Sequence, residues 1–297
     1  MSVYWQNRAR RNIEPLSTAE QHTANARRRI VKSTVSHGVL IVLALTTLLP
    51  FLWMVLASFK TRTEVERINP FPTLWHPENY LRVFEQIPFA RYYFNSVFVS
   101  AWVTALQCLT SALAAYAFAR ITWRGRDSVF RLYLTTLMIP GVVTMIPNFT
   151  LMVQLHLLDS YAGLIVPAAF SAFGTFLLRQ FMLTIPKSLD EAAGIDGATH
   201  WQIFWDVILP LARPGLITLA VFTFMGTYGS FTWPLIMIKS EGLRTLPIGM
   251  LFFDSNYGKQ TELIMAASVM NILPLILLFV LTQRFLVEGI QLGGVKG

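Results

Sequence analysis

The chain has 297 residues, of which 54% are hydrophobic and 13% are charged, and its formal net charge is +8. Soluble proteins carry about 25% charged residues. The composition therefore excludes intrinsic disorder and argues against a water-soluble enzyme, and a mean hydropathy of +0.50 points to lipid as the main solvent. The one cysteine, Cys108, excludes an intramolecular disulfide and a cysteine zinc site, and we expect it to be a buried apolar group.

Six stretches are long and apolar enough to cross a bilayer, which takes about 20 residues. They cover residues 35–59, 92–119, 128–153, 162–185, 214–238 and 263–287. Backbone polar groups must be satisfied inside the bilayer, so each stretch is predicted to be a helix. The sequence thus predicts an all-α integral membrane protein with a six-span domain over 35–287. An N-terminal arm, 1–34, precedes it, and a tail, 288–297, follows it.

The charges predict the orientation of these spans. With the N-terminus in the cytoplasm, sixteen Lys and Arg residues fall on the cytoplasmic side and eight outside, while the acidic residues divide eight and eight. The whole net charge of +8 then lies on the cytoplasmic side. This is the positive-inside pattern of membrane proteins. We therefore expect both the N-terminal arm and the C-terminal tail to be cytoplasmic.

Glycine and proline interrupt most of the later spans. The interrupting residues are Pro140, Gly141, Pro147, Pro167, Gly174, Gly226, Gly229, Pro234 and Pro274. One interpretation is ordinary, because these residues are common in membrane helices. The other is that the kinks line a path that opens and closes.

The segment 186–214 lies on the predicted cytoplasmic side, between the fourth and fifth spans. Ser188 and Glu191 have the spacing of a capping box, which predicts a helix that starts after Pro186 and stops near Gly194. The pair Asp196-Gly197 is then a turn signal. If Gly197 has a positive φ, any side chain there is costly.

A second helix is predicted to follow that turn, because Thr199 and Gln202 form another capping box. An apolar stripe at i, i+3, i+4 and i+7 is expected on one face, formed by Trp201, Phe204, Trp205 and Ile208. Pro210 and Pro214 end the helix before the next span. On physical grounds alone, this segment is a hairpin of helices at the membrane surface with aromatic anchors. Its small residues suggest close approach by another protein.

The same segment resembles the EAA signature of ABC importer permeases. That pattern is E-A-A, two residues, D-G-A, five residues, F, four residues, L-P, three residues and P. The matching positions are Glu191, Ala192, Ala193, Asp196, Gly197, Ala198, Phe204, Leu209, Pro210 and Pro214. In that family the loop is the coupling helix that docks into a cleft on a cytoplasmic ATPase subunit. The resemblance implies the type I importer permease fold with a cytoplasmic coupling helix.

The resemblance extends over residues 35–297. The pairs Asn79-Tyr80 and Asn95-Ser96 look like the approach to the second span in binding-protein-dependent sugar permeases. The end of the chain looks like the tail of the maltose-type, MalG-like half, which reaches between the ATPase subunits; it comprises Gly293, Gly294, Val295, Lys296 and Gly297. The resemblance thus implies transport of sugars or oligosaccharides, neutral or acidic.

The resemblance also implies partners in a bacterial or archaeal cytoplasmic (inner) membrane. These are a second homologous permease subunit, two ATPase subunits and an extracytoplasmic solute-binding protein. The sequence lacks the G-x-x-x-x-G-K-[ST] phosphate loop, so ATP and Mg²⁺ are expected in the partner ATPase. This chain is then not itself an enzyme, and neither a cofactor, a metal site nor a nucleic-acid partner is expected for it.

Candidate residues of the substrate pathway are Asn148, Tyr228 and Trp233, which are polar or aromatic groups within spans. Aromatic rings suit sugars because a ring face can stack on them, although helix packing or interface anchoring is the commoner role of such residues. The loop 239–262 resembles the loop that reaches toward the solute-binding protein in this family. Asp159 and Glu262 flank spans, and we expect both to be solvated.

Two alternatives remain open at this point. The same machinery could carry glycerol phosphate, amino acids, peptides or polyamines. A secondary transporter driven by ions, a different class, would need acidic residues deep within spans, and none lies near a span centre. A membrane enzyme would need a polar catalytic cluster at one depth, which the sequence also lacks.

Overall fold

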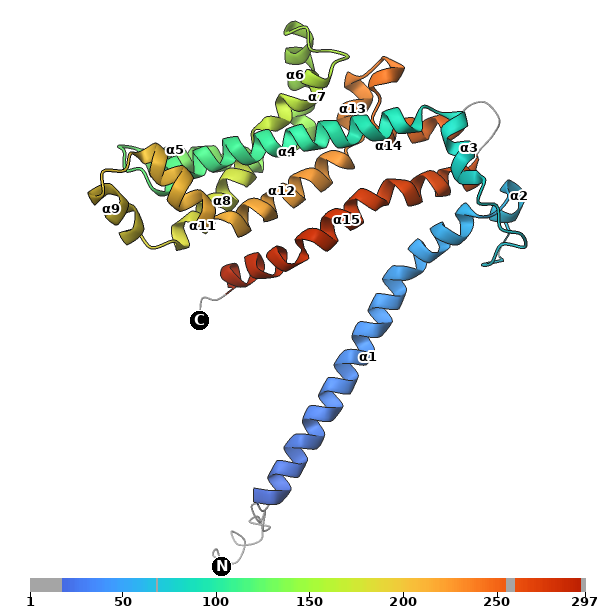
Figure 1. Ribbon diagram of the computed structural model, residues 1–297, viewed down its shortest axis with the longest axis horizontal. Coiled ribbons are helices and arrows are strands. Elements are labelled where there is room, and N and C mark those ends of the chain that lie inside the picture. Colours follow the sequence, from blue (N-terminus) through green and yellow to red (C-terminus); the bar gives the residue numbers. More distant parts are fainter. Residues whose placement is uncertain (1–17, 68, 255–259, 295–297) are drawn as a thin grey trace, which may run out of the picture. The chain divides into compact units, whose positions relative to one another are not determined.

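The computed structural model describes residues 18–67, 69–254 and 260–294, and the regular elements among them are helices (Figure 1). The chain divides after Val55 into two compact units. Most of the first unit's described part is the helix α1, Thr18–Ser58, which has 41 residues. At 1.5 Å per residue α1 is about 60 Å long, twice what a membrane needs. The part from Lys32 to Ser58 is apolar enough to span.

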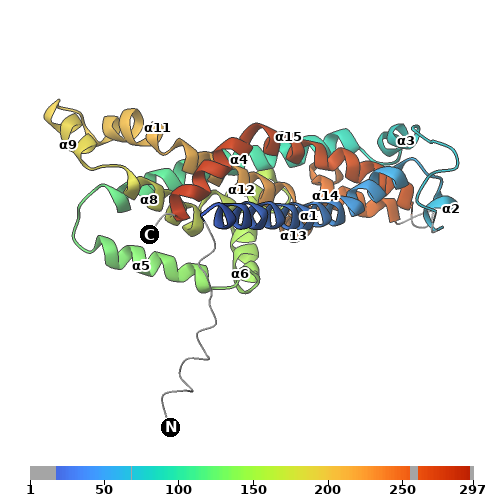
Figure 2. The ribbon, with the colours of Figure 1, turned by 90° about the horizontal axis from the view of Figure 1, so that it is seen from below.

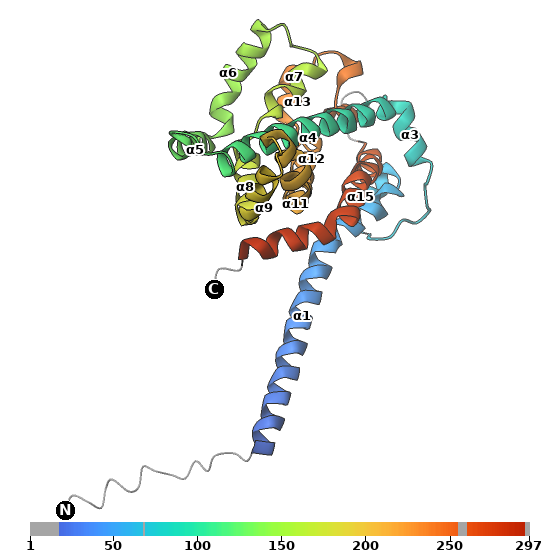
Figure 3. The same cartoon turned by 60° about the vertical axis from the view of Figure 1, so that its left-hand side comes forward.

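Two further predicted spans are single helices. The helix α4, Phe89–Ala119, is the second span, and α15, Thr261–Gly294, contains the sixth, with a span-like part up to Phe285. Figures 2 and 3 show that α4 runs through the length of the second unit. It packs on α8, Ala172–Thr184, and on α12, Arg213–Tyr228, which in turn contacts α15. The core of the second unit therefore forms around α4.

The third, fourth and fifth predicted spans are broken, and these are spans that the sequence showed to be interrupted by glycine and proline. In the third, α5 (Arg126–Thr135) and η1 (Thr136–Met138) meet α6 (Gly141–Gln154) at 98°. In the fourth, α7 (Tyr161–Ile165) and η2 (Pro167–Ala169) meet α8 at 43°. In the fifth, α12 stops at Tyr228, and α13 follows from Thr232 to Met237.

The break in the third span has a local cause. Pro140 restricts the residue before it to extended backbone, and Ile139 has a ψ of 117°. Proline also lacks the N–H that a continuing helix would need. Pro140 thus marks a real break, whereas Pro147 and Pro274 lie inside the helices α6 and α15 and do not interrupt them.

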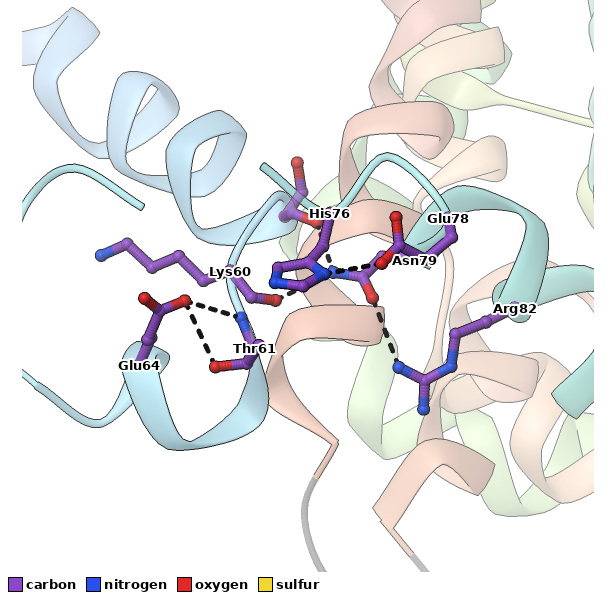
Figure 4. Close-up of polar contacts among 8 residues, drawn as sticks. Lys60, Thr61, Glu64, His76, Glu78, Asn79 and Arg82 are labelled. Atoms are coloured by element: carbon purple, nitrogen blue, oxygen red, sulfur yellow. Dashed lines mark hydrogen bonds and ion pairs between the residues drawn. The ribbon is translucent and has the colours of Figure 1, made fainter. Parts of the chain in front are cut away.

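The loop after α1 is ordered by polar side chains (Figure 4). Asn79, the first residue of α3 (Asn79–Gln86), donates 2.9 Å hydrogen bonds from Nδ2 to the carbonyl oxygens of Ser58 and Lys60. Glu64, in α2 (Arg62–Val65), accepts hydrogen bonds from Thr73 and Thr61, which lower the pKa of Glu64 to about 2. The segment between α1 and α3 is thus held by hydrogen bonds near both of its ends.

The part of the second unit that the charges predict to lie on the outer side contains three short helices, η4 (Glu241–Leu243), α14 (Leu246–Gly249) and η5 (Met250–Asp254). Leu246 belongs to a buried cluster with residues of α3, α4 and α15. Gly249 lies against the ring of Tyr92, which is buried. A Cβ atom on Gly249 would come within 2.1 Å of Tyr92 Cδ2.

Replacing Gly249 by alanine should destabilise this outer part. Overpacking a filled core costs about 1–3 kcal/mol, so G249A should lower the midpoint of thermal unfolding in detergent. Gly242 lies in the same loop and has nothing within 4 Å of an added Cβ, so G242A is the matched control. Equal midpoints for the two variants would contradict this packing.

Candidate functional site

The segment 186–214, called the coupling hairpin below, is helical on both sides of a tight turn. Its first arm is α9, Ser188–Ile195. Its second arm comprises α10 (His200–Gln202), η3 (Ile203–Ile208) and α11 (Leu209–Leu211). These elements lie at one end of the second unit, whereas α3 lies at the other (Figure 2).

The predicted start of the first arm is right, but its predicted capping box is wrong. The N-cap is Lys187, with no side-chain hydrogen bond, and Ser188 is already the first helical residue. The second box is confirmed: Thr199 Oγ1 accepts from Gln202 N at 3.4 Å, and Gln202 Oε1 accepts from Thr199 N at 2.8 Å.

The turn between the arms depends on Gly197, which has a φ of +82°. Ala198 N donates to the Ala193 carbonyl at 2.9 Å, and Gly197 N donates to that of Gly194 at 3.1 Å. These two bonds are those of a Schellman motif, whose left-handed position strongly favours glycine. The positive φ considered for Gly197 from the sequence is therefore present.

The second arm differs from the predicted single stripe because η3 is a π-helix. Its wider i→i+5 winding turns Phe204 and Ile208 inward, where both are buried, while Trp205 is partly exposed and Trp201 is 61% exposed. The Phe204 ring meets the Tyr116 ring edge-on at 5.2 Å. This arm is part of a core cluster with residues of α4 and α8.

A buried ion pair holds the first arm to the end of α4. Arg120 caps the C-terminus of α4, and its side chain is 3% exposed. Its Nη1 lies 3.3 Å from Asp190 Oδ2 on α9, and its Nη2 donates to the Ile185 carbonyl at 2.9 Å. No motif in the sequence pointed to this pair. The available signal was an arginine directly after an apolar span and an acidic residue before Glu191.

The structure divides the EAA signature into two sets. Phe204 is buried, while Ala193, Ala198, Leu209 and Pro210 are partly buried. The set that faces outward comprises Glu191, Ala192, Asp196 and Gly197. Ile195, between these residues, is 88% exposed, and exposed Trp201 follows on the next arm. The hairpin thus presents an apolar and acidic surface while its other side packs in the core.

The predicted C-terminal tail is described only in part. Gly293 and Gly294 are the last residues of α15. Val295, Lys296 and Gly297 lie outside the described residues. The tail assignment therefore stays a prediction.

A cavity of about 720 Å³ lies among α4, α6, α7 and the break between α12 and α13. Asn148 and Trp233 line it, and Trp233 Nε1 donates to the Gly163 carbonyl at 3.1 Å. Tyr228 is not among its lining residues. The Tyr228 side chain is buried, and its hydroxyl donates to the Asn271 carbonyl at 3.2 Å. The structure thus brings two of the three candidate pathway residues together.

The turn 239–244, called the outer turn after its predicted side of the membrane, is held by side chains from two other parts of the chain. Asp159 Oδ1 accepts from the amides of Lys239 and Ser240, each at 2.9 Å. Hydrogen bonds from Ser240 are the main cause that lowers the pKa of Asp159. Asn95 Nδ2 donates to the Gly242 and Arg244 carbonyls at 2.9 and 2.8 Å. The turn is therefore fixed before any partner binds.

The two acidic residues expected to be solvated are not free surface groups. Asp159 is partly buried and holds the outer turn. Glu262, in the first turn of α15, is 3% exposed, so that expectation is wrong. Their positions beside spans did not reveal these environments, because the partners of Asp159 lie 80 residues along the chain.

Residues 107–287 match the family described as the binding-protein-dependent transport system inner membrane component. The chain is 36% identical over 261 residues to the arabinooligosaccharides transport system permease protein AraQ of Halalkalibacterium halodurans, covering 86% of this chain and 93% of that one. It is 33% identical over 270 residues to the lactose transport system permease protein LacG of Rhizobium radiobacter, covering 91% and 98%.

One solved structure agrees with these matches. It is the crystal structure of a bacterial ABC transporter involved in the import of the acidic polysaccharide alginate, with a TM-score of 0.78 at 25% identity, covering 88% of this chain and 98% of that chain. The chain therefore belongs to the family of inner-membrane permeases of binding-protein-dependent ABC importers. Its fold is that of a type I importer permease, as the EAA resemblance implied.

Removing the Asp159 carboxylate should loosen the outer turn. In D159A the amides of Lys239 and Ser240 lose their acceptor, and an exposed hydrogen bond contributes about 0.5–1.5 kcal/mol. Hydrogen exchange at these amides should therefore become about threefold to tenfold faster. D159N should change it less, because asparagine keeps an acceptor and tolerates the positive φ of 57° at this position. Unchanged exchange in D159A would contradict the clamp.

Proposed function

We propose that this permease moves sugars or oligosaccharides across the membrane, driven by ATP that a separate subunit hydrolyses. The cargo is supported by relatives of similar length whose names state arabinooligosaccharides and lactose. The hydrolysis is assigned to a partner because the sequence contains no phosphate loop. ATP and Mg²⁺ then bind to the ATPase and not to this chain.

The coupling hairpin is the proposed docking element for that ATPase. The observation that carries this proposal is its division into a buried side and an exposed side. Phe204 and Ile208 fix one side in the core, while Glu191 and Ile195 are exposed on the other. Protein interfaces have an apolar core and a polar rim, and exposed Ile195 between acidic residues fits this arrangement. The exposed side would bind the ATPase, while the buried side packs against the spans. A movement of the ATPase can therefore be passed through the hairpin to the spans.

The proposed complex contains this chain, a second homologous permease subunit, two ATPase subunits and an extracytoplasmic solute-binding protein. The basic charges favour cytoplasmic termini, which places the hairpin on the ATPase side. The outer turn held by Asp159 and Asn95 then faces the solute-binding protein. Glu191 is assigned a contact with the ATPase cleft, since it is exposed and takes no part in capping α9.

Purification of the complex from native membranes tests this proposal. An affinity tag on this chain should retain ATPase subunits in a fixed ratio, and the reconstituted complex should take up neutral oligosaccharides only with ATP. Reproducible absence of an ATPase would refute the coupling role. Uptake of amino acids or polyamines in place of saccharides would refute the cargo and leave the coupling role intact.

Substitution of Gly197 should separate membrane insertion from ATPase docking. A left-handed conformation costs most residues about 1–2 kcal/mol, and a bulky side chain also enlarges the exposed surface. G197L should therefore insert normally but retain little or no ATPase on purification. Asparagine tolerates the left-handed conformation, so G197N should keep the turn. It therefore tests only whether the added side chain blocks docking of the ATPase. G194A, at a helical glycine with nothing within 4 Å, should bind the ATPase normally.

Deleting residues 293–297 should impair transport more than insertion. If the tail reaches between the ATPase subunits, its loss should lower ATP-dependent uptake severalfold while the amount of chain in the membrane stays unchanged. A deletion of residues 1–7, in the N-terminal arm, controls for shortening of the chain. Wild-type uptake after removal of 293–297 would reject the tail assignment.

A further inference from the structure

Three interrupted spans meet at the 720 Å³ cavity. Gly141 and Val142 line it directly after the break in the third span, and Pro167 lies in η2 just before the break in the fourth. The fifth span contributes residues on both sides of its break, among them Thr227 and Trp233. The breaks are far apart in sequence and converge on one space.

This convergence has a physical meaning in a membrane. Non-helical backbone is tolerated at membrane depth only where it packs in protein or lines a water-filled space. Broken helices around a central site are the way transporters present polar groups to a solute. The cavity volume also lies within the range of about 300–1,000 Å³ for small-molecule sites. The space is therefore suited to a solute.

The chemistry of the wall restricts that solute. Among the described residues that line the cavity, none is charged. Polar groups come from the Asn148 amide and from hydroxyls, which belong to Ser96, Thr227, Ser230, Thr232 and Thr245. Two aromatic rings, Phe231 and Trp233, complete the wall. A charged solute would lose its hydration here without a counter-charge, at a large free-energy cost.

Two side chains show in more detail what the cavity wall offers to a solute. The Trp233 indole N–H is already used by the Gly163 carbonyl, so the ring offers the cavity its π surface. Thr245 is 5% exposed, and its hydroxyl has no hydrogen-bond partner among the described residues. Buried hydroxyls are normally paired. The wall thus combines aromatic surfaces for stacking with a hydroxyl that has no hydrogen-bond partner among the described residues.

We propose that this cavity is a solute site within this subunit for an uncharged sugar ring, and that it disfavours acidic saccharides. The ring would stack on Phe231 or Trp233 while its hydroxyls bond Asn148 and the threonines. This inference rests on the proposed sugar cargo and narrows it. It separates this chain from the structurally similar alginate importer, whose cargo is acidic.

Thiol protection in the assembled complex tests the site directly. In a C108S background, T232C places a thiol at an exposed residue of the wall, and F222C places one at an exposed residue of α12 that does not line the cavity. The rate of modification by N-ethylmaleimide is measured with arabinotriose, with lactose and with an alginate trisaccharide. The neutral sugars should slow modification at 232 at least threefold, and they should leave 222 unchanged.

Other outcomes overturn the proposal. Protection by the alginate trisaccharide equal to that by lactose rejects the preference for uncharged rings. A thiol at 232 that reacts in the isolated chain but not in the complex means that the second permease fills the cavity. Reaction that no saccharide slows rejects the site. Should T232C fail to assemble, N148C, also at an exposed lining residue, replaces it.

Measurements of lactose uptake and ATP hydrolysis distinguish a wrong assignment of this site from a wrong proposed function. F231A removes one stacking ring, a contact worth roughly threefold to tenfold in affinity, and should lower lactose uptake by about that factor. F222A removes an exposed ring elsewhere on the same span and should not. ATP hydrolysis stimulated by the solute-binding protein should persist in both variants. Equal uptake by F231A and F222A rejects the site, whereas loss of all stimulated hydrolysis in the wild type rejects the coupling role.

Discussion

The architecture of the end of the second unit that carries the coupling hairpin depends on one buried guanidinium. Arg120 is almost fully enclosed, and a buried charge is strongly unfavourable unless it is paired. Its partners come from two different places, Asp190 on α9 and the carbonyl of Ile185 after α8. Because Arg120 also ends α4, three segments meet at its side chain. The exposed arm of the coupling hairpin therefore cannot move freely without disturbing the second and fourth spans.

A second arginine supports the same region. Arg179 on α8 donates from Nε to the Phe118 carbonyl at 3.2 Å, and its guanidinium lies 4.1 Å from the centre of the Phe130 ring on α5. Phe204 adds apolar contact from the other arm of the hairpin. The helices α4, α5 and α8 are thus joined by cation and ring contacts in addition to helix packing.

Local patterns in the sequence predicted where the helices lie better than they predicted which residues each helix contacts. Apolar length located the three helices that are long enough to span, α1, α4 and α15, and Thr199 with Gln202 marked the second arm of the hairpin, because both signals act within a few residues. The pairing of Arg120 with Asp190 joins positions 70 residues apart, and no local pattern encodes it. The π-helix η3 was also missed, and it changes which residues share a face. Asn148 and Trp233 were named for their chemistry, and only the fold shows that they line one cavity.

The helix α4 contacts all three regions on which the proposals rest. With 31 residues it is about 46 Å long. Near its start Asn95 holds the turn 239–244, one residue later Ser96 lines the cavity, and after its last residue Arg120 holds the hairpin. In the proposed complex, a movement of the hairpin that shifts Arg120 would be passed along α4 to the wall of the cavity and to the turn, because the hydrogen bonds of a helix resist compression. The proposed ATPase docking and the proposed solute site are thus connected by one helix.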